Sequence, residues 1–410
     1  MRVGGHRAIR HQPIERHRIP AHVHDGRVDL GSGRLDDVIQ TSVREDLLRL
    51  SREIHDYPEL AYQERRAVDR ICTLLQDQGL EVERGIAGVA TAFRSRIGPP
   101  SGPSLALLAE YDALPEVGHG CGHNLIAMTN VGAFVDIAAD RPKLDLAIEL
   151  IGTPAEEHGA GKQDLLDAGI FRDVVAVLSS HPSSTPRWTC GERSLGVIER
   201  RVTYRGVASH AAYSPDLGRN ALNGLIRLFV GIDGWRQHLP PNTRVHGVIT
   251  YGGGASNVVP ERAEGMFGFR AADQATLQQM SATFIDIAKG AALQTGTAVE
   301  MEDGRPYLPL APNATLTKLL GEELRTCGLD PESGGIFMAS TDLGNVSQVV
   351  PTDHVSFPVT TELIPGHSHA MTAASVSDLA HRNAFIVIDV LAAAARRVAT
   401  DRAIRKDLGA

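Results

Sequence analysis

Apolar residues recur along the chain in two rhythms, which predict alternating helices and strands. Between residues 39 and 54, apolar side chains are spaced by three or four positions, as in an amphipathic helix. The segment SLALLAEYD, residues 104–112, is almost continuously apolar in its first part, as expected of a strand covered on both faces. Helical and strand-like segments alternate from there to about residue 178. The sequence therefore predicts an α/β fold with a mostly parallel sheet.

The pattern changes near residue 191. Residues 194–207 alternate like a half-exposed strand, and two helical and two further strand-like segments follow. Long helical patterns return after about residue 306. We therefore predict a main domain that is interrupted by a smaller α+β lid domain. The expected boundaries are a flexible Arg- and His-rich extension at residues 1–34, the main domain at residues 35–192 and 306–410, and the lid domain at residues 193–305.

Composition excludes several classes of protein. The 410 residues carry 41 Lys and Arg against 49 Asp and Glu, a net charge of -8, and no basic stripe, so nucleic acid is not an expected partner. The four cysteines lie far apart, which suits a reducing compartment rather than a disulfide framework. No apolar run reaches the roughly 18 residues of a membrane span, and the N-terminus lacks the apolar core of a secretory signal. We expect a cytoplasmic protein without a membrane partner.

Polar side chains gather where the predicted strands end. In open α/β sheets, ligands bind in the crevice outside the carboxyl ends of the strands, so these side chains are expected to converge on one site. Taken singly, a histidine, a cysteine or a glutamate pair is more often structural than functional. Their joint occurrence in this order favours a site. The candidates are Asp112, Cys121, His123, Glu156, Glu157, His181, His367 and His369.

The donor types point to divalent metal. Thiolate, imidazole and carboxylate bind ions such as Zn²⁺, Mn²⁺ or Co²⁺. The five candidate ligands are Cys121, His123, Glu157, His181 and His367. They are one more than a closed tetrahedral centre needs, which predicts two ions or one ion with an open position. Glu156, next to a ligand, suits the general base of a hydrolase. Asp112 suits a role in orienting a ligating histidine.

Several motifs resemble a known family. The block HGCGH after ALP, and the segments TPAEE, ASHAA, SNVVP, ASTDLGNVS and PGHS, look like the two-metal amidohydrolases and exopeptidases of the zinc exopeptidase superfamily, which include aminoacylases and bacterial carboxypeptidases. The resemblance covers nearly the whole chain from about residue 45. HGCGHNLIA and STDLGNVSQVVPT are most similar to the p-aminobenzoyl-glutamate hydrolase and β-alanyl-lysine dipeptidase branch, although Asn124 stands where many members carry Asp.

The resemblance implies two divalent ions per subunit, with Zn or Mn expected and Co or Ni also suitable. Cys121 would bridge them, with His123 and Glu157 on one side and His181 and His367 on the other. His369 would point the same way as His367 in an extended stretch, but the resemblance favours His367. Glu156 would act as the base, and Asp112 would orient the site.

The resemblance also implies roles for the lid domain. His210 would stabilise the oxyanion, often from the partner subunit of a homodimer formed through this domain. Asn257 and Arg270 would lie near the carboxylate of a small-molecule substrate, a task that suits the two-pronged Arg side chain.

These roles imply a hydrolase that uses metal-activated water. The expected reaction cleaves an amide (C–N) bond in a small carboxylate-bearing compound, such as an N-acyl amino acid, a dipeptide or an aminobenzoyl conjugate. One alternative is an aromatic aminohydrolase of the nitroanthranilate type, which would release ammonia. Another is a non-catalytic binding or regulatory protein on the same fold, which the complete set of ligands and base disfavours.

Overall fold

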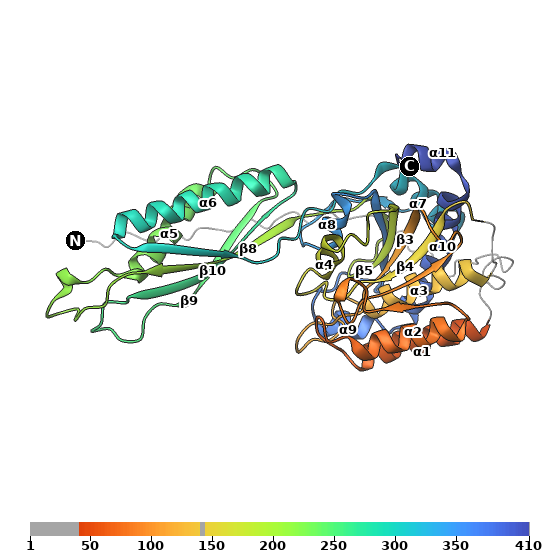
Figure 1. Cartoon of the computed structure of the whole chain (residues 1–410), viewed down its shortest axis with the longest axis horizontal. Helices are drawn as coiled ribbons and strands as arrows, with labels where there is room; N and C mark the ends of the chain where they lie inside the picture. The colour runs from red at the N-terminus through yellow and green to blue at the C-terminus, as the bar shows by residue number, and fades with distance from the viewer. Residues whose placement is uncertain (1–40, 140–143, 410) are drawn as a thin grey trace, which may run out of the picture. The chain divides into compact units, whose positions relative to one another are not determined.

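The computed structural model describes residues 41–139 and 144–409 (Figure 1). In this part of the chain the strands form an eight-stranded sheet, a four-stranded sheet and a two-stranded pair. The extension predicted at residues 1–34 lies outside the described residues. None of the described helices is long and apolar enough to cross a membrane.

The larger sheet is mixed, with a parallel centre. Strands β4, β3, β5 and β14 are neighbours and run parallel, so their carboxyl ends meet at one edge, whereas β1, β2 and β6 add antiparallel pairs. The predicted α/β fold with a mostly parallel sheet is therefore confirmed. In spatial order the strands are β1 (Glu83–Arg84), β2 (Phe93–Ile97), β4 (Ala147–Gly152), β3 (Ser104–Ala109), β5 (Val174–Ser183), β14 (Thr352–Pro358), β6 (Thr189–Cys190) and β12 (Glu332–Ser333).

Helices cover both faces of this sheet. In β3, Leu105 and Leu107 pack into one buried cluster, whereas Ala106 and Leu108 pack into another, because successive side chains of a strand point to opposite faces. One cluster includes residues of α1 (Thr41–Asp56), α2 (Arg65–Asp77), α3 (His123–Ala139), α7 (Ala314–Thr326), α9 (His369–Ala374) and α10 (Asp378–Thr400), with α11 (Arg402–Asp407) packed against it. The other includes residues of η1 (Ile86–Gly88), α4 (Gly161–Asp167) and α8 (Leu343–Ser347).

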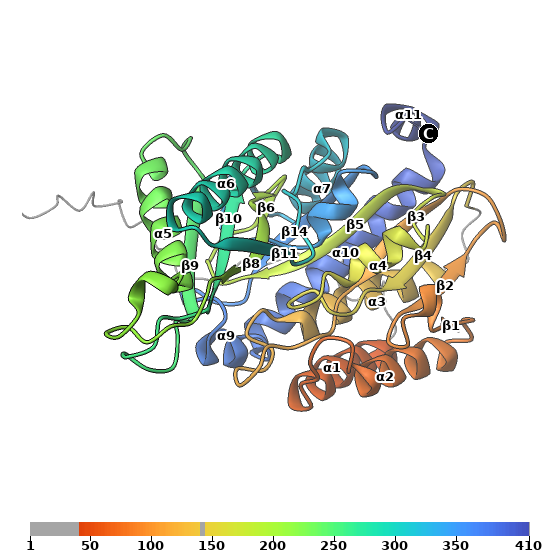
Figure 2. The same cartoon turned by 60° about the vertical axis from the view of Figure 1, so that its left-hand side comes forward.

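The four-stranded sheet (Figure 2) is antiparallel. It has a hydrophobic core of its own. Its order is β11 (Ala298–Asp303), β8 (Gly196–Arg205), β10 (Arg262–Ala271) and β9 (Arg244–Tyr251). Helices α5 (Ala221–Arg236) and α6 (Gln274–Thr295) pack on it, and η2 (Pro215–Leu217) precedes α5. The remaining pair joins β7 (Arg193–Ser194) and β13 (Ile336–Phe337). The sequence did not predict β11, and the domain boundaries stay a prediction.

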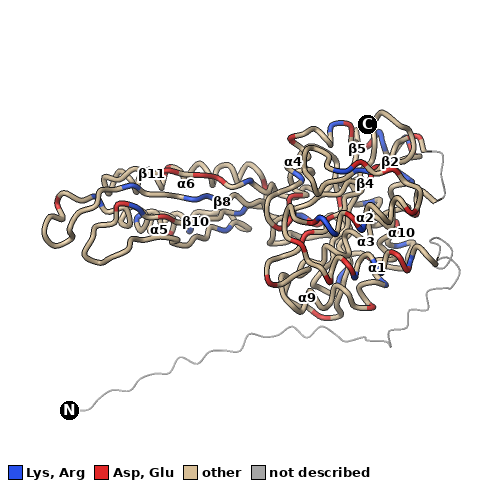
Figure 3. Tube along the Cα trace, turned by 60° about the horizontal axis from the view of Figure 1, so that its bottom comes forward, with Lys and Arg blue, Asp and Glu red and all other residues tan. Residues whose placement is uncertain are grey.

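Neither acidic nor basic residues are concentrated in one part of the described backbone. Figure 3 shows acidic and basic residues interspersed along both sheets and their helices. A surface that binds nucleic acid concentrates Lys and Arg on one face, and the described residues carry no such arrangement in this view.

Candidate metal centre

The candidate ligands lie at the edge where the parallel strands end. Asp112 follows β3, Glu156 and Glu157 follow β4, and His181 lies near the end of β5. His123 is the first residue of α3. Because these strands are neighbours and run parallel, residues far apart in the sequence meet at one place.

Three overlapping clusters of side chains are close enough to hold metal. Within each cluster the ligand atoms lie within 4.8 Å of one another. The clusters are Cys121 with His123 and His181, Cys121 with Glu157 and His367, and Glu110 with His123 and Glu156. Cys121 belongs to two of them, as expected of a bridging thiolate. The two clusters that share Cys121 group His123 with His181 and Glu157 with His367. The resemblance implies the other grouping, His123 with Glu157 and His181 with His367, although His123 and Glu157 also approach to 3.8 Å.

The side chain of His123 is completely buried, and its two ring nitrogens face different carboxylates. Its Nδ1 lies 2.9 Å from Oδ1 of Asp112, and its Nε2 lies 3.7–3.8 Å from carboxylate oxygens of Glu110, Glu156 and Glu157. Nε2 has no hydrogen-bond partner in the structure. A buried nitrogen without a partner is costly, so its position among carboxylates fits a metal ligand.

The turn that carries Glu156 and Glu157 is held from three sides. Glu64 accepts the backbone N–H of Ala155 at 2.9 Å, and Asp112 accepts that of Glu157 at 2.9 Å. The hydroxyl of Tyr307 donates to the carbonyl of Glu156 at 2.8 Å. Ala155 has a φ of 59°, which is strained for a residue with a Cβ. These contacts hold the strained turn in place, so the positions of both glutamates are set by the fold.

The electrostatics of the carboxylates suit a proton acceptor beside a metal. Burial raises the pKa of Glu156 well above its usual range, and the neighbouring charges of Glu110 and Glu157 add to the effect. Burial also raises the pKa of Glu157. For Asp112 the burial penalty is outweighed by His123, which lowers the pKa of that carboxyl. A bound cation would favour the ionised form of every one of these groups.

Cys121 and His181 form the other side of the centre. Their Sγ and Nε2 atoms lie 3.5 Å apart, and Nδ1 of His181 lies 2.8 Å from the carbonyl oxygen of Pro182. Burial lowers the pKa of His181 to about 4, so its ring is neutral and Nε2 is available to a metal. Burial raises the pKa of the Cys121 thiol, which favours the protonated form until a cation is bound.

The structure distinguishes His367 from His369 as the candidate metal ligand. His367 has a φ of 51°, and its Nε2 lies 3.7 Å from Oε2 of Glu157. His369 begins α9 and belongs to none of the described clusters. The extended stretch that would align the two rings is therefore absent here, and the geometry favours His367.

The lid residues are not brought to these clusters by any contact in the described part of the chain. Nδ1 of His210 accepts the backbone N–H groups of Ala212 and Tyr213, and the residue is exposed. Asn257 is exposed. Arg270 donates to the hydroxyl of Ser340 at 2.8 Å.

Sequence reasoning missed a buried ion network behind the clusters. Lys162 is completely buried and contacts Glu110 at 2.8 Å and Asp342 at shorter range. A signal was present for Glu110, since it lies two residues before Asp112 at the same strand end. The burial of Lys162 has no local signal, because its partner Asp342 is 180 positions away.

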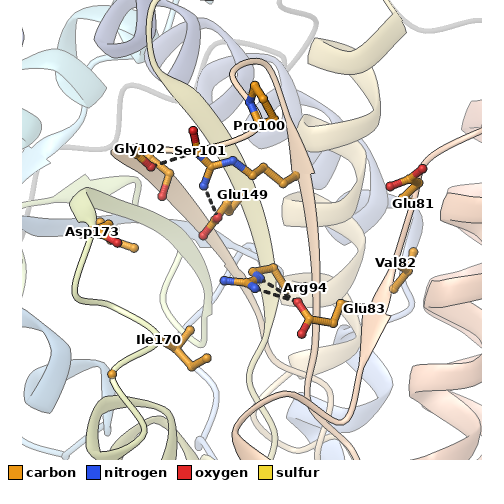
Figure 4. A pocket seen from close by; sticks show the side chains of 14 residues that line it. Glu81, Val82, Glu83, Arg94, Pro100, Ser101, Gly102, Glu149, Ile170 and Asp173 are labelled. Atoms are coloured by element: carbon orange, nitrogen blue, oxygen red, sulfur yellow. Dashed lines mark hydrogen bonds and ion pairs between the residues drawn. The ribbon is translucent and has the colours of Figure 1, made fainter.

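A cavity of about 620 Å³ lies elsewhere, where β3 and β5 begin (Figure 4). Its lining includes Arg94 and Glu149, and each is ion-paired, Arg94 with Glu83 and Glu149 with Arg96. None of the candidate ligands lines it. We therefore place the site at the other edge of the sheet, where the donors converge.

Known proteins resemble this chain in sequence and in fold. The chain is 36% identical over 356 residues to the Xaa-Arg dipeptidase of Mus musculus, covering 82% of this chain and 81% of the relative. It is 32% identical over 317 residues to one of the subunits of the p-aminobenzoyl-glutamate hydrolase of Escherichia coli, covering 72% and 65%. The fold matches that of Bacillus subtilis YXEP, described as a dinuclear metal binding peptidase from the M20 family, with a TM-score of 0.65, 20% identity and coverage of 85% and 99%.

The family model of peptidase family M20/M25/M40 matches residues 106–396, a span that includes Glu110, every candidate ligand and the candidate base. The chain belongs to peptidase family M20/M25/M40 and is a metallohydrolase of that family.

Proposed function

We propose that this protein cleaves the amide bond of a small carboxylate-bearing substrate, such as a dipeptide, an N-acyl amino acid or an aminobenzoyl conjugate. The observation that carries the proposal is the convergence of five donors beside Glu156, a buried carboxylate that the proposed ligand set leaves free to act as a base. The relatives named as a dipeptidase and as an aminobenzoyl-glutamate hydrolase support this choice of bond.

Two divalent ions, Zn or Mn, are the proposed cofactors, held by Cys121, His123, Glu157, His181 and His367. When bound, such ions lower the pKa of water and polarise the carbonyl of the substrate. Glu156 takes the proton of the attacking water and returns it to the leaving amine. Burial and the neighbouring charges of Glu110 and Glu157 raise its pKa, and a bound cation would favour the ionised form that accepts this proton.

We propose that the lid residues bind the substrate. Arg270 would pair with the substrate carboxylate, because a guanidinium offers two parallel donors, and Asn257 would assist it. His210 would donate from Nε2 to the oxyanion, since its Nδ1 is engaged by backbone N–H groups.

We also propose a homodimer through the lid domain. Strand β9 lies at an edge of the four-stranded sheet, and its Val248 is 58% exposed. Ile226 and Val230 of α5 are exposed as well. An exposed apolar edge strand is a template for pairing with another chain, so a second copy of this surface is a fitting partner.

The reaction is tested with metal-reconstituted protein and a panel of dipeptides, N-acyl amino acids, aminobenzoyl conjugates and aromatic amines. Free amine and free acid should appear in equal amounts from the amide substrates, without ammonia. Ammonia released from aromatic amines would instead show a deaminase. Protein that holds two ions but turns over no amide would contradict the proposal.

A further inference from the structure

The side chain of Glu110 is divided between two environments. It follows β3 directly, and the residue is only 3% exposed. Its Oε1 accepts from Nζ of Lys162 at 2.8 Å. Its Oε2 has no hydrogen-bond partner and lies 3.7 Å from Nε2 of His123, which also lacks one. Two buried atoms that both lack partners therefore face each other inside the metal centre.

Lys162 holds one half of this carboxylate in place. It lies in α4 with no exposed surface, and its ammonium group contacts both Glu110 and Asp342. Asp342 also accepts the backbone N–H of Lys162 at 3.0 Å, so the lysine is fixed at both ends. The ammonium group occupies Oε1 and leaves Oε2 as the free oxygen of Glu110.

Lys162 alone does not balance the buried charge. It contacts two carboxylates, and a third, Glu156, lies in the same cluster as Glu110. For all three carboxyl groups to be ionised, further positive charge is needed beside Lys162, and a bound divalent ion would supply it. One oxygen each of Glu110 and Glu156 and one ring nitrogen of His123 lie within 4.8 Å of one another, which is a spacing that one divalent ion can span. Nε2 of His123 lies 3.7 Å from Oε2 of Glu110 and 3.8 Å from Oε2 of Glu156.

We propose that Glu110 is a further metal-binding residue, whose Oε2 joins Nε2 of His123 at one of the two ions. Lys162 acts as a positioning residue that keeps Glu110 a one-oxygen donor. This inference rests on the proposed two-metal hydrolase, and it adds a carboxylate that the five-ligand set omits. The competing explanation is that Glu110 is only an ion-pair partner of Lys162.

The test compares the metal affinity of three full-length proteins without substrate. Glu110→Gln has only one side-chain oxygen: if this oxygen stays with Lys162, the NH₂ group faces the metal, and if the neutral oxygen faces the metal, the NH₂ group faces Lys162. Glu149→Gln is the matched control, because Glu149 is also 3% exposed and paired with one cation, Arg96, in the cavity of Figure 4. Competition with a chelator measures the affinities for Co²⁺ and Mn²⁺, and the visible spectrum of bound Co²⁺ reports a change of ligand number.

One of the two ions should bind roughly 10- to 100-fold more weakly to Glu110→Gln, with a changed Co²⁺ spectrum, whereas Glu149→Gln should match the wild type. Two ions bound by Glu110→Gln with wild-type affinity and spectrum would leave Glu110 as a partner of Lys162 only. If Glu110→Gln does not fold, Glu110→Asp keeps the charge for Lys162 but shortens its reach by one methylene. That variant should also bind one ion more weakly, and wild-type binding by it would overturn the inference. Wild-type protein that binds no divalent ion would instead refute the proposed hydrolase itself.

Discussion

Asp112 holds His123 by a hydrogen bond of 2.9 Å between Oδ1 and Nδ1, and both side chains are buried. The other oxygen of Asp112 accepts the backbone N–H of Glu157. One carboxylate thus orients two candidate ligands, one at the start of α3 and one after β4. It also leaves Nε2 as the nitrogen of His123 that faces the centre.

Asp112→Asn should weaken metal binding without unfolding the protein. An Asn oxygen can still accept from His123, but its NH₂ group would then face the N–H of Glu157, and both are donors. We expect a loss of roughly 10- to 100-fold in affinity for one ion, measured by chelator competition. Asp273→Asn is the control, because Asp273 caps α6 and Asn caps equally well. Unchanged affinity in Asp112→Asn would show that this bond does not orient the ligand.

Substitutions of the two adjacent glutamates should have different effects on metal binding and turnover. Glu156→Gln should keep both ions but lose turnover by at least roughly a hundredfold, the usual scale for a general base. Glu157→Gln should lose metal, because Glu157 lies between His123 and His367 at 3.8 and 3.7 Å. Metal content and kcat are measured on the same samples. Wild-type rates in Glu156→Gln would remove it from the mechanism.

The strand ends that carry donors were predictable from the sequence. Continuous apolar runs such as that of β3 identify buried parallel strands, and parallel strands end at the same edge, so Asp112 and His181 were expected to meet. The structure brings them together with Cys121 and His123, as expected. Periodicity is local information, and here it was sufficient because the sheet itself supplies the long-range geometry.

The ion network behind the metal centre was not predictable in the same way. A lysine in a polar helical segment is normally solvated, and the burial of Lys162 depends on Asp342, far along the chain. The two-residue strands β1, β6, β7, β12 and β13 carry too few residues for any periodicity. His210 and Asn257 stay predictions as well, because no contact in the described residues joins them to the donors.

Glu64 should make stability depend on pH. Burial raises its pKa from 4.5 to about 7 in the folded protein. The folded state therefore holds this proton more tightly, and the resulting stabilisation is fully present below pH 4.5 and is lost as the pH rises through about 7. The side chain of Glu64→Gln does not titrate. The difference in free energy of unfolding, variant minus wild type, should therefore rise by up to roughly 3 kcal/mol as the pH rises over that interval. Urea unfolding with a chelator present, at several pH values, measures this difference, and parallel pH profiles would contradict it.

Val248→Lys should separate the proposed dimer into monomers. A charge on an exposed edge strand opposes pairing with a second strand, and Val248 lies on the edge strand β9. Leu293→Lys is the matched control, because Leu293 is 84% exposed but lies on α6. Light scattering after size exclusion should give dimers for the wild type and Leu293→Lys, and monomers for Val248→Lys.

The same variant tests whether the site needs its partner. If His210 acts across the dimer interface, Val248→Lys should keep both metal ions but lose turnover, because no described contact brings His210 to the donors of its own chain. Metal content, mass and kcat of Val248→Lys and Leu293→Lys are therefore compared together. Full turnover by monomeric Val248→Lys would show that each chain carries a complete site, and a monomeric wild type would refute the dimer.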